Sequence, residues 1–124
     1  AIPAIVFTEP EIVSVGLTPD EAKEAGEEII TGKFPLAANG RALTMEAEKT
    51  GGFVRVVARA SDHVILGVQA TGSHVSELSG EFTLALEMGA VLEDIAGTIH
   101  AHPTMTESFH EGVLKTLGHA IHSA

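Results

Sequence analysis

Two runs of β-branched and apolar residues, joined by a polar tripeptide, constrain the fold of this chain more than any other feature. The runs cover residues 53–60 and 64–70, and the tripeptide is Ser61-Asp62-His63. Valine, isoleucine and phenylalanine fit a pleated, half-buried surface, and a short polar connection between two such runs favours an antiparallel hairpin. The sequence therefore predicts this hairpin at the centre of a sheet.

Three further apolar runs predict shorter strands. We expect them at residues 2–7, 12–15 and 29–34, with a bend at Pro10 between the first two. Residues 36–48 have mixed polarity and contain an Asn-Gly pair, which favours a turn with a short helical piece. Strands and helices do not alternate regularly, so the sequence predicts an α+β domain whose mainly antiparallel sheet is flanked by helices on one side.

Helices are predicted from the spacing of apolar residues and from helix-end signals. Thr18 and Glu21 match the capping box that starts a helix, and Gly26 is a favourable residue after its end. Apolar residues recur at helical spacing until Gly89, so one long amphipathic helix is expected before it. The expected helices cover residues 18–26, 75–88, 93–96 and 106–117, and the last has Phe109, Val113, Leu114 and Leu117 on a face that should pack or dimerise.

The segment at residues 98–107, T-I-H-A-H-P-T-M-T-E, places a histidine before a proline and a carboxylate five residues further on. Proline fixes its own φ and disfavours helical geometry in the residue before it, so His102 should stand at a junction where Pro103 opens a helix. Glu107 would lie about one turn inside that helix, where its carboxylate can accept the Nδ1 proton of His102 and fix the tautomer. The other ring nitrogen would face outward as a base.

A second interpretation of these residues stays open. Thr104 and Glu107 have the spacing of a capping box, which closes a helix N-terminus without catalysis, and from spacing alone this is the commoner reason for such a pattern. A base also needs a group to deprotonate, and the chain has no cysteine, tryptophan or tyrosine, no glycine-rich phosphate loop and no G-x-S-x-G elbow. His102 and Glu107 are therefore half of a site at most.

Both ends of the chain resemble one known family. The C-terminal part is similar to that of the pyridine nucleotide-disulfide oxidoreductases in the strings HAHPTMTES and FHEGVLKTLGHAIH, and the N-terminal part resembles their entry into the interface domain in AIPAIVFTEPEIVSVGLTPDEAKEAG. The middle of the chain resembles the hairpin and helix of the same domain in GGFVRVVARASDHVILGVQATGSHVSELSGEFTLALEMG. The resemblance implies that residues 1–124 form one interface (dimerisation) domain, cut from a longer flavoenzyme.

The resemblance also implies roles for the histidine and the carboxylate. His102 would be the acid-base histidine, Glu107 the residue that orients it, and the His102–Pro103 peptide bond cis. In such enzymes this histidine reaches the FAD and the reactive disulfide of the other subunit, so His102 and Pro103 would contact the cofactor. The histidine takes a proton from dihydrolipoamide, and the resulting thiolate attacks the disulfide before FAD passes the electrons to NAD. Neither cofactor should bind this chain alone, because the G-x-G-x-x-G fingerprint and the C-x-x-x-x-C pair are absent from it.

Within the family, three details resemble bacterial dihydrolipoamide dehydrogenases more than glutathione or mercuric reductases. They are His100 before the base, the L-x-x-L-G-H-A-I-H tail and the absence of a C-terminal cysteine pair. The expected activity is thus that of a dihydrolipoyl dehydrogenase in the full-length protein. The isolated domain is expected to form a homodimer but to be inactive.

The charge of the chain bears on its partners. The net charge is -10, which disfavours nucleic acid because phosphate binding needs clustered basic residues. An acidic surface suits a basic partner, and the resemblance implies the subunit-binding domain of the acyltransferase in a 2-oxo acid dehydrogenase complex, with Glu87 as a candidate docking residue. The alternative is that the acidic residues serve solubility alone.

Three further expectations follow from composition. The sequence has no run of about 18 apolar residues, so no membrane contact is expected. The absence of cysteine fits a reducing cytoplasm, which the resemblance also implies. Five of the seven histidines lie in the last quarter of the chain, but their spacing argues against a metal site, and His119 with His122 should at most bind added nickel or zinc.

Overall fold

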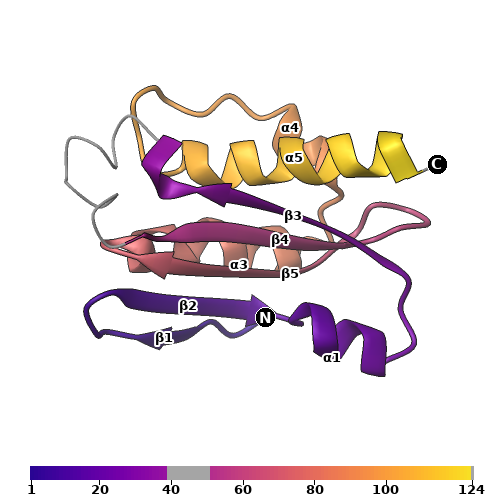
Figure 1. The fold of residues 1–124 in the computed structure, drawn as a ribbon, viewed down its shortest axis with the longest axis horizontal. Helices are drawn as coiled ribbons and strands as arrows, with labels where there is room; N and C mark the ends of the chain where they lie inside the picture. Colours follow the sequence, from indigo (N-terminus) through magenta and orange to yellow (C-terminus); the bar gives the residue numbers. More distant parts are fainter. Residues whose placement is uncertain (39–50, 124) are drawn as a thin grey trace.

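The computed structural model describes the backbone of residues 1–38 and 51–123 and the side chains of residues 1–37 and 51–118. The strands in this part of the chain form one antiparallel sheet in the order β1-β2-β5-β4-β3 (Figure 1). They are β1 (Ala4–Val6), β2 (Glu11–Gly16), β3 (Ile29–Pro35), β4 (Phe53–Arg59) and β5 (Ile65–Gly72). The predicted hairpin is confirmed as β4 and β5, with β5 in the middle of the sheet.

The helices α3 and α5 cover one face of this sheet, as the sequence predicts for an α+β domain. Figure 1 shows α5 running alongside β3 and β4, and α3 packs against β2 and β5. The helical elements are α1 (Pro19–Glu24), η1 (Leu36–Ala38), η3 (Val75–Leu78), α3 (Ser79–Glu87), α4 (Leu92–Ala96) and α5 (Glu107–Ser123). Of the predicted turn at residues 36–48, only η1 lies within the described residues. No described helix is long and apolar enough to cross a membrane.

Alternation along the central strands builds the core beneath these helices. Val54 and Val56 of β4 pair with Ala70 and Val68 of β5, and all four side chains are buried. Above them, the ring of Phe82 in α3 meets the ring of Phe109 in α5 edge to face, with centroids 4.9 Å apart at an interplanar angle of 68°. Such aromatic pairs stabilise by about 0.5–1.5 kcal/mol beyond the area they bury.

The predicted ends of α1 and the predicted bend at Pro10 are confirmed, whereas the first strand is shorter than predicted. Thr18 caps α1 with the reciprocal hydrogen bonds of a capping box, and Gly26 follows the helix in left-handed geometry with a φ of 82°. Pro10 forms a bend between β1 and β2 after a cis peptide bond. The strand predicted at residues 2–7 is shorter, since only β1 is paired and Ile2 and Phe7 on either side of it are exposed.

The single long helix predicted over residues 75–88 is wrong. A 3-10 turn, η3, precedes α3, and it begins after His74, whose φ of 65° is left-handed. The turn is held from β2, because the Glu11 carboxylate accepts a hydrogen bond from the Ser76 N–H at 3.1 Å. Glu9 adds a similar contact, since its carboxylate accepts from the Ser73 hydroxyl at 3.1 Å. These hydrogen bonds hold Ser73 and Ser76 against β2 and the turn before it. The segment before α3 therefore forms a 3-10 turn in place of the first turn of a continuous helix.

The last helix also differs from its prediction. It begins at Glu107 instead of residue 106 and continues to Ser123. Phe109, Val113 and Thr116 face the sheet and are fully buried, whereas Leu114 is 40% exposed and does not lie on the predicted face. The buried residues follow the i, i+4, i+7 spacing of one helix stripe, and a residue directly after one of them is rotated away from it by about 100°.

Candidate functional site

The loop between α4 and α5 carries His102 on the surface of the domain. The His102–Pro103 peptide bond is cis, as the resemblance implied. Pro103 does not open the helix as predicted, because a turn intervenes in which the Ser108 N–H donates to the Met105 carbonyl at 3.0 Å. Glu107 is consequently the first residue of α5 and not one turn inside it. The carboxylate therefore lies beside the loop itself.

This position lets the Glu107 carboxylate contact two parts of the loop at once. Both of its oxygens lie 3.0 Å from Nδ1 of His102, and Oε1 also accepts a hydrogen bond from the Thr104 N–H at 3.0 Å. The contact with Thr104 has the i, i+3 spacing of the predicted capping box, but it closes the turn before α5, because Glu107 is the first residue of that helix. One carboxylate thus both holds the turn before α5 and orients the imidazole.

The geometry fixes which nitrogen of His102 carries the proton. An ionised carboxylate can only accept, so Nδ1 donates and Nε2 keeps the lone pair in the neutral ring. The His102 side chain is 78% exposed, against 24% for Glu107. Among the described residues Nε2 has no hydrogen-bond partner, so this nitrogen is available to an incoming group.

The environment of Glu107 keeps its carboxylate ionised. Partial burial raises the pKa of Glu107, but the hydrogen bonds from His102 and Thr104 together lower it by more, with help from the nearby charges of His102 and His100. The net pKa lies below the ordinary value of 4.5. A carboxylate beside the imidazole stabilises the protonated ring, which is what a proton acceptor requires.

A second histidine lies beneath the exposed one. His100 is only 5% exposed, and its Nε2 lies 2.8 Å from Oε2 of Glu81 in α3. Its ring stacks on that of His110 in α5, with centroids 4.9 Å apart. Apart from the H-A-H spacing, nothing in the sequence indicates this contact, because Glu81 occupies an ordinary polar position in the amphipathic pattern of its helix.

A cavity of about 320 Å³ opens beside His100 and Glu81. Its lining includes Glu81 and His100 together with Leu84 and Ile99, which are 61% and 97% exposed. Met88, the C-cap residue that directly follows α3, is 75% exposed. Together Leu84, Met88 and Ile99 form an exposed apolar surface, which we call the α3 surface.

The carboxylates near α3 differ in exposure and in whether they accept a hydrogen bond from another group. Glu87, the predicted docking residue, is the last residue of α3 and its side chain is 63% exposed. Glu93 instead binds Nδ1 of His63 at 2.7 Å, and that hydrogen bond lowers the pKa of Glu93. The carboxylate of Asp94 accepts from the Val91 N–H at the start of α4.

No group of three or more His, Cys, Asp or Glu side chains that could hold a metal ion occurs among residues 1–37 and 51–118, whose side chains the structure describes. His119 and His122, the pair for which added metal was considered, have side chains outside the described set. Their metal binding remains a prediction.

Comparison with known protein families gives one match across most of the chain. Residues 2–113 match the family described as "Pyridine nucleotide-disulphide oxidoreductase, dimerisation domain". Over 122 residues the chain is 59% identical to a protein of Pseudomonas aeruginosa named dihydrolipoyl dehydrogenase, covering 98% of this chain and 26% of that protein. It is 54% identical to dihydrolipoyl dehydrogenase 2 of Haloarcula marismortui, covering 99% of this chain and 26% of the relative.

Solved structures show the same fold. LpdA from Mycobacterium tuberculosis superposes with a TM-score of 0.83 at 28% identity, over 91% of this chain and 24% of that one. RclA from Escherichia coli, a HOCl-induced flavoprotein disulfide reductase, superposes with a TM-score of 0.84 at 26% identity, over 91% and 26% of the two chains. The chain therefore spans about a quarter of the length of the relatives it matches.

Proposed function

We propose a function from two premises: the chain belongs to the family of pyridine nucleotide-disulphide oxidoreductase dimerisation domains, and it carries an exposed histidine oriented by a carboxylate. The proposal is that this domain pairs two subunits and supplies His102 and Glu107 in trans to the FAD and disulfide of the partner subunit. The reaction would be the NAD-dependent oxidation of dihydrolipoamide. The observation that supports it is the contact of both Glu107 oxygens with Nδ1 of His102 at 3.0 Å.

The proton transfer would use the outward nitrogen of His102. Nε2 accepts the proton of the substrate thiol, which leaves a thiolate as the attacking nucleophile. Glu107 stabilises the imidazolium that forms and prevents the ring from turning, so the same nitrogen can later return the proton. General acid-base catalysis of this kind contributes about 10²–10⁴-fold to a rate.

The residues around His102 fit contact with a flavin-bearing subunit. His102 and Pro103 are exposed side by side and would meet the cofactor of the partner. FAD, when bound there, would take up the electrons that the thiolate delivers, and NAD would carry them away. The residues that hold the phosphates of both cofactors would come from the remaining three quarters of a protein as long as the relatives, in which residues 1–124 would be one domain.

A chimera tests the catalytic proposal. This chain replaces the matching segment of the P. aeruginosa relative, and we measure dihydrolipoamide oxidation with NAD. We expect an active chimera and, for His102→Gln, a loss of at least about 100-fold in kcat. His74→Asn is the matched control, because His74 is an exposed histidine on the segment before η3. Equal activity of the His102→Gln and parent chimeras would contradict the proposal.

Action in trans has its own test. One chimera carries His102→Gln, and a second has an intact His102 but serines in place of the redox cysteines that the family supplies upstream. Each should be inactive as a homodimer. Mixed dimers should regain about half of the parent activity per dimer, because one of their two sites combines an intact disulfide with an intact histidine. Mixed dimers without activity would place the histidine and the disulfide of a site in the same subunit.

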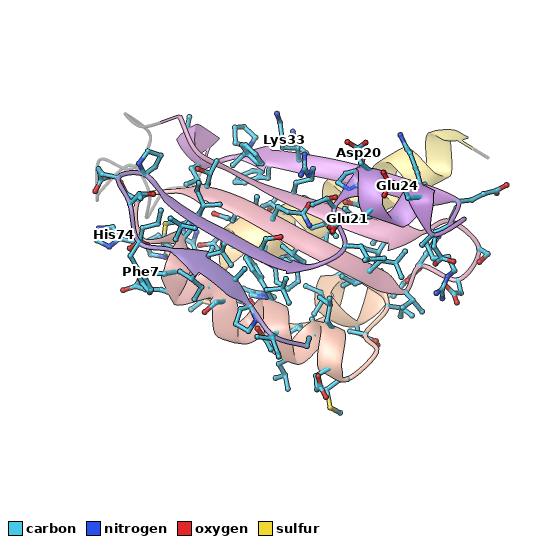
Figure 2. The ribbon with its side chains drawn as sticks, turned by 90° about the horizontal axis from the view of Figure 1, so that it is seen from below. Phe7, Asp20, Glu21, Glu24, Lys33 and His74 are labelled. Carbon is cyan, nitrogen blue, oxygen red and sulfur yellow. The ribbon has the colours of Figure 1, made fainter. Side chains whose placement is uncertain are left out.

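Docking of a partner is a second candidate function. It rests on the exposed carboxylate of Glu87 and on the net charge of -10, which suit the basic subunit-binding domain of a 2-oxo acid dehydrogenase complex in the cytoplasm. Glu87→Lys should weaken binding in a salt-dependent way, whereas Glu24→Lys on α1 should not. Figure 2 shows Glu24 projecting from α1, which makes it a suitable exposed control. Unchanged affinity of the Glu87 variant at low salt would contradict docking at this residue.

A further inference from the structure

His100 is held between two hydrogen-bond acceptors. Its Nδ1 lies 2.9 Å from the backbone oxygen of Thr98, and its Nε2 lies 2.8 Å from Oε2 of Glu81. A backbone carbonyl can only accept, so Nδ1 carries a proton. An ionised carboxylate can also only accept, so Nε2 carries a second proton when Glu81 is ionised. With Glu81 ionised, the two contacts together are those of a positively charged imidazole ring.

The surroundings of Glu81 favour this distribution of charge. Its other oxygen, Oε1, is buried and has no hydrogen-bond partner among the described residues. A desolvated carboxylate is costly without a neighbouring positive charge, and the ring of His100 is the group that lies against it. The charge of His100 also affects the first residue of α5, because it contributes to the lowered pKa of Glu107.

His100 precedes His102 by two residues, so its contacts anchor the loop directly before the exposed histidine. The ring ties this loop to α3 through Glu81 and stacks on His110 of α5. His110 is fixed in turn, because its Nε2 lies 3.0 Å from the backbone oxygen of Ala96 at the end of α4. The ring of His100 therefore contacts α3 and α5 directly and is linked to α4 through His110.

We propose that His100 is a doubly protonated positioning residue which, with Glu81, fixes the loop that carries His102 so that Nδ1 of His102 stays on Glu107. The proposed function supplies the reason why the orientation of His102 matters. The inference itself concerns proton positions and ring orientation, which can be measured in this chain without any catalytic activity.

The test is a long-range 1H–15N NMR spectrum of the uniformly labelled chain, which reports the protonation of each ring nitrogen. At neutral pH both nitrogens of His100 should show shifts typical of an imidazolium ring. At alkaline pH His102 should show a single tautomer protonated at Nδ1. In Glu81→Gln, His100 should become neutral and His102 should change to a mixture of the two tautomers.

The matched control is Glu93→Gln, which removes the carboxylate from the other His–Glu contact, with His63. It should change the shifts of His63 and leave His102 unchanged. A neutral His100 in the unsubstituted chain, or unchanged His102 shifts in a folded Glu81→Gln chain, would overturn the proposal. If Glu81→Gln does not fold by its amide spectrum, His100→Gln takes its place with the same expected effect on His102. An inactive chimera with these NMR signatures intact would sink the catalytic proposal and leave this one standing.

Discussion

Both carboxylate oxygens of Glu107 lie 3.0 Å from Nδ1 of His102, although the two residues are in different structural elements. The histidine stands in the loop after α4, and the glutamate begins α5. A single carboxylate thus couples the start of a helix to the orientation of an exposed ring. The stability of the domain and the orientation of the His102 ring should therefore both depend on the ionisation of Glu107.

That coupling predicts how stability depends on pH. The pKa of Glu107 is lower in the folded chain than its ordinary value of 4.5, so the carboxylate stabilises the fold fully above that value. This contribution is lost as pH falls from 4.5 through the lower folded pKa, because the unfolded chain then binds the proton more readily. In Glu107→Gln, urea unfolding should depend less steeply on pH in this range than in the parent chain.

Other carboxylates set the background for this measurement. Hydrogen bonds also lower the pKa values of Asp62 and Glu93, so part of the acid destabilisation will remain in the variant. Glu24→Gln on α1 is the control substitution at an exposed carboxylate. A Glu107→Gln chain with the same pH slope as its parent would mean that the contact with His102 does not persist in solution.

The aromatic contact between α3 and α5 gives a prediction on packing. Phe82 and Phe109 are fully buried, and alanine at either position should leave a cavity and lower the free energy of unfolding by about 3–5 kcal/mol. Phe7→Ala should cost far less, because Phe7 is 74% exposed. Figure 2 shows Phe7 at the turn between β1 and β2. The measurement is equilibrium unfolding in urea, monitored by far-UV circular dichroism.

A double variant tests whether the rings stabilise each other. In a Phe82→Ala, Phe109→Ala double variant the losses should not add, because the first substitution already removes the edge-to-face contact. We expect the double loss to be smaller than the sum by about 0.5–1.5 kcal/mol. Additive losses would show that the two rings contribute independently.

The close approach of α5 to β3 predicts a strong effect of a small change. A Cβ on Gly32 would lie 2.4 Å from Oγ1 and 2.6 Å from the backbone N of Thr116. Backbone cannot move aside as a flexible side chain can, so Gly32→Ala should destabilise the chain by about 1–3 kcal/mol. Gly118→Ala is the matched control, since a Cβ there meets nothing within 4 Å and should stabilise α5 by about 0.5–1 kcal/mol. Thermal unfolding of both variants tests this prediction. Equal melting temperatures of the Gly32→Ala and Gly118→Ala chains would contradict the predicted clash.

These residues show where sequence-based prediction succeeds in this protein. The hairpin of β4 and β5 was predictable because its strands are adjacent in sequence and rich in valine. The contact of His102 with Glu107 was predictable because five residues separate them and a proline restricts the chain between. Short range and restricted backbone geometry are what these two successes share.

Contacts between distant segments could not be predicted in the same way. Glu11 supports the start of η3 from 65 residues away, and Glu81 reaches His100 across 19. Each of these carboxylates fits a plain polar position in its own strand or helix pattern, so nothing local distinguishes it from a solvated one. Gly32 is a similar case. A side chain at this position would clash only because α5 lies on β3.

The α3 surface predicts where two copies of the chain meet. Leu84, Met88 and Ile99 are 61%, 75% and 97% exposed, and a contiguous apolar surface of this kind favours association. In a two-fold dimer each residue occurs twice at the interface, so a charge placed there is also introduced twice. Met88→Lys should therefore raise the dissociation constant at least about 30-fold, which corresponds to about 2 kcal/mol.

Sedimentation equilibrium over a concentration series measures this constant. Phe7→Lys is the matched control, because Phe7 is 74% exposed, nearly as much as Met88, but lies outside the α3 surface. Both substitutions are at exposed positions, so each should change the stability of the fold by less than about 0.5 kcal/mol. A Phe7 variant that dissociates as readily as the Met88 variant would place the interface elsewhere. A parent chain that stays monomeric at every concentration would mean that segments outside this domain provide most of the association.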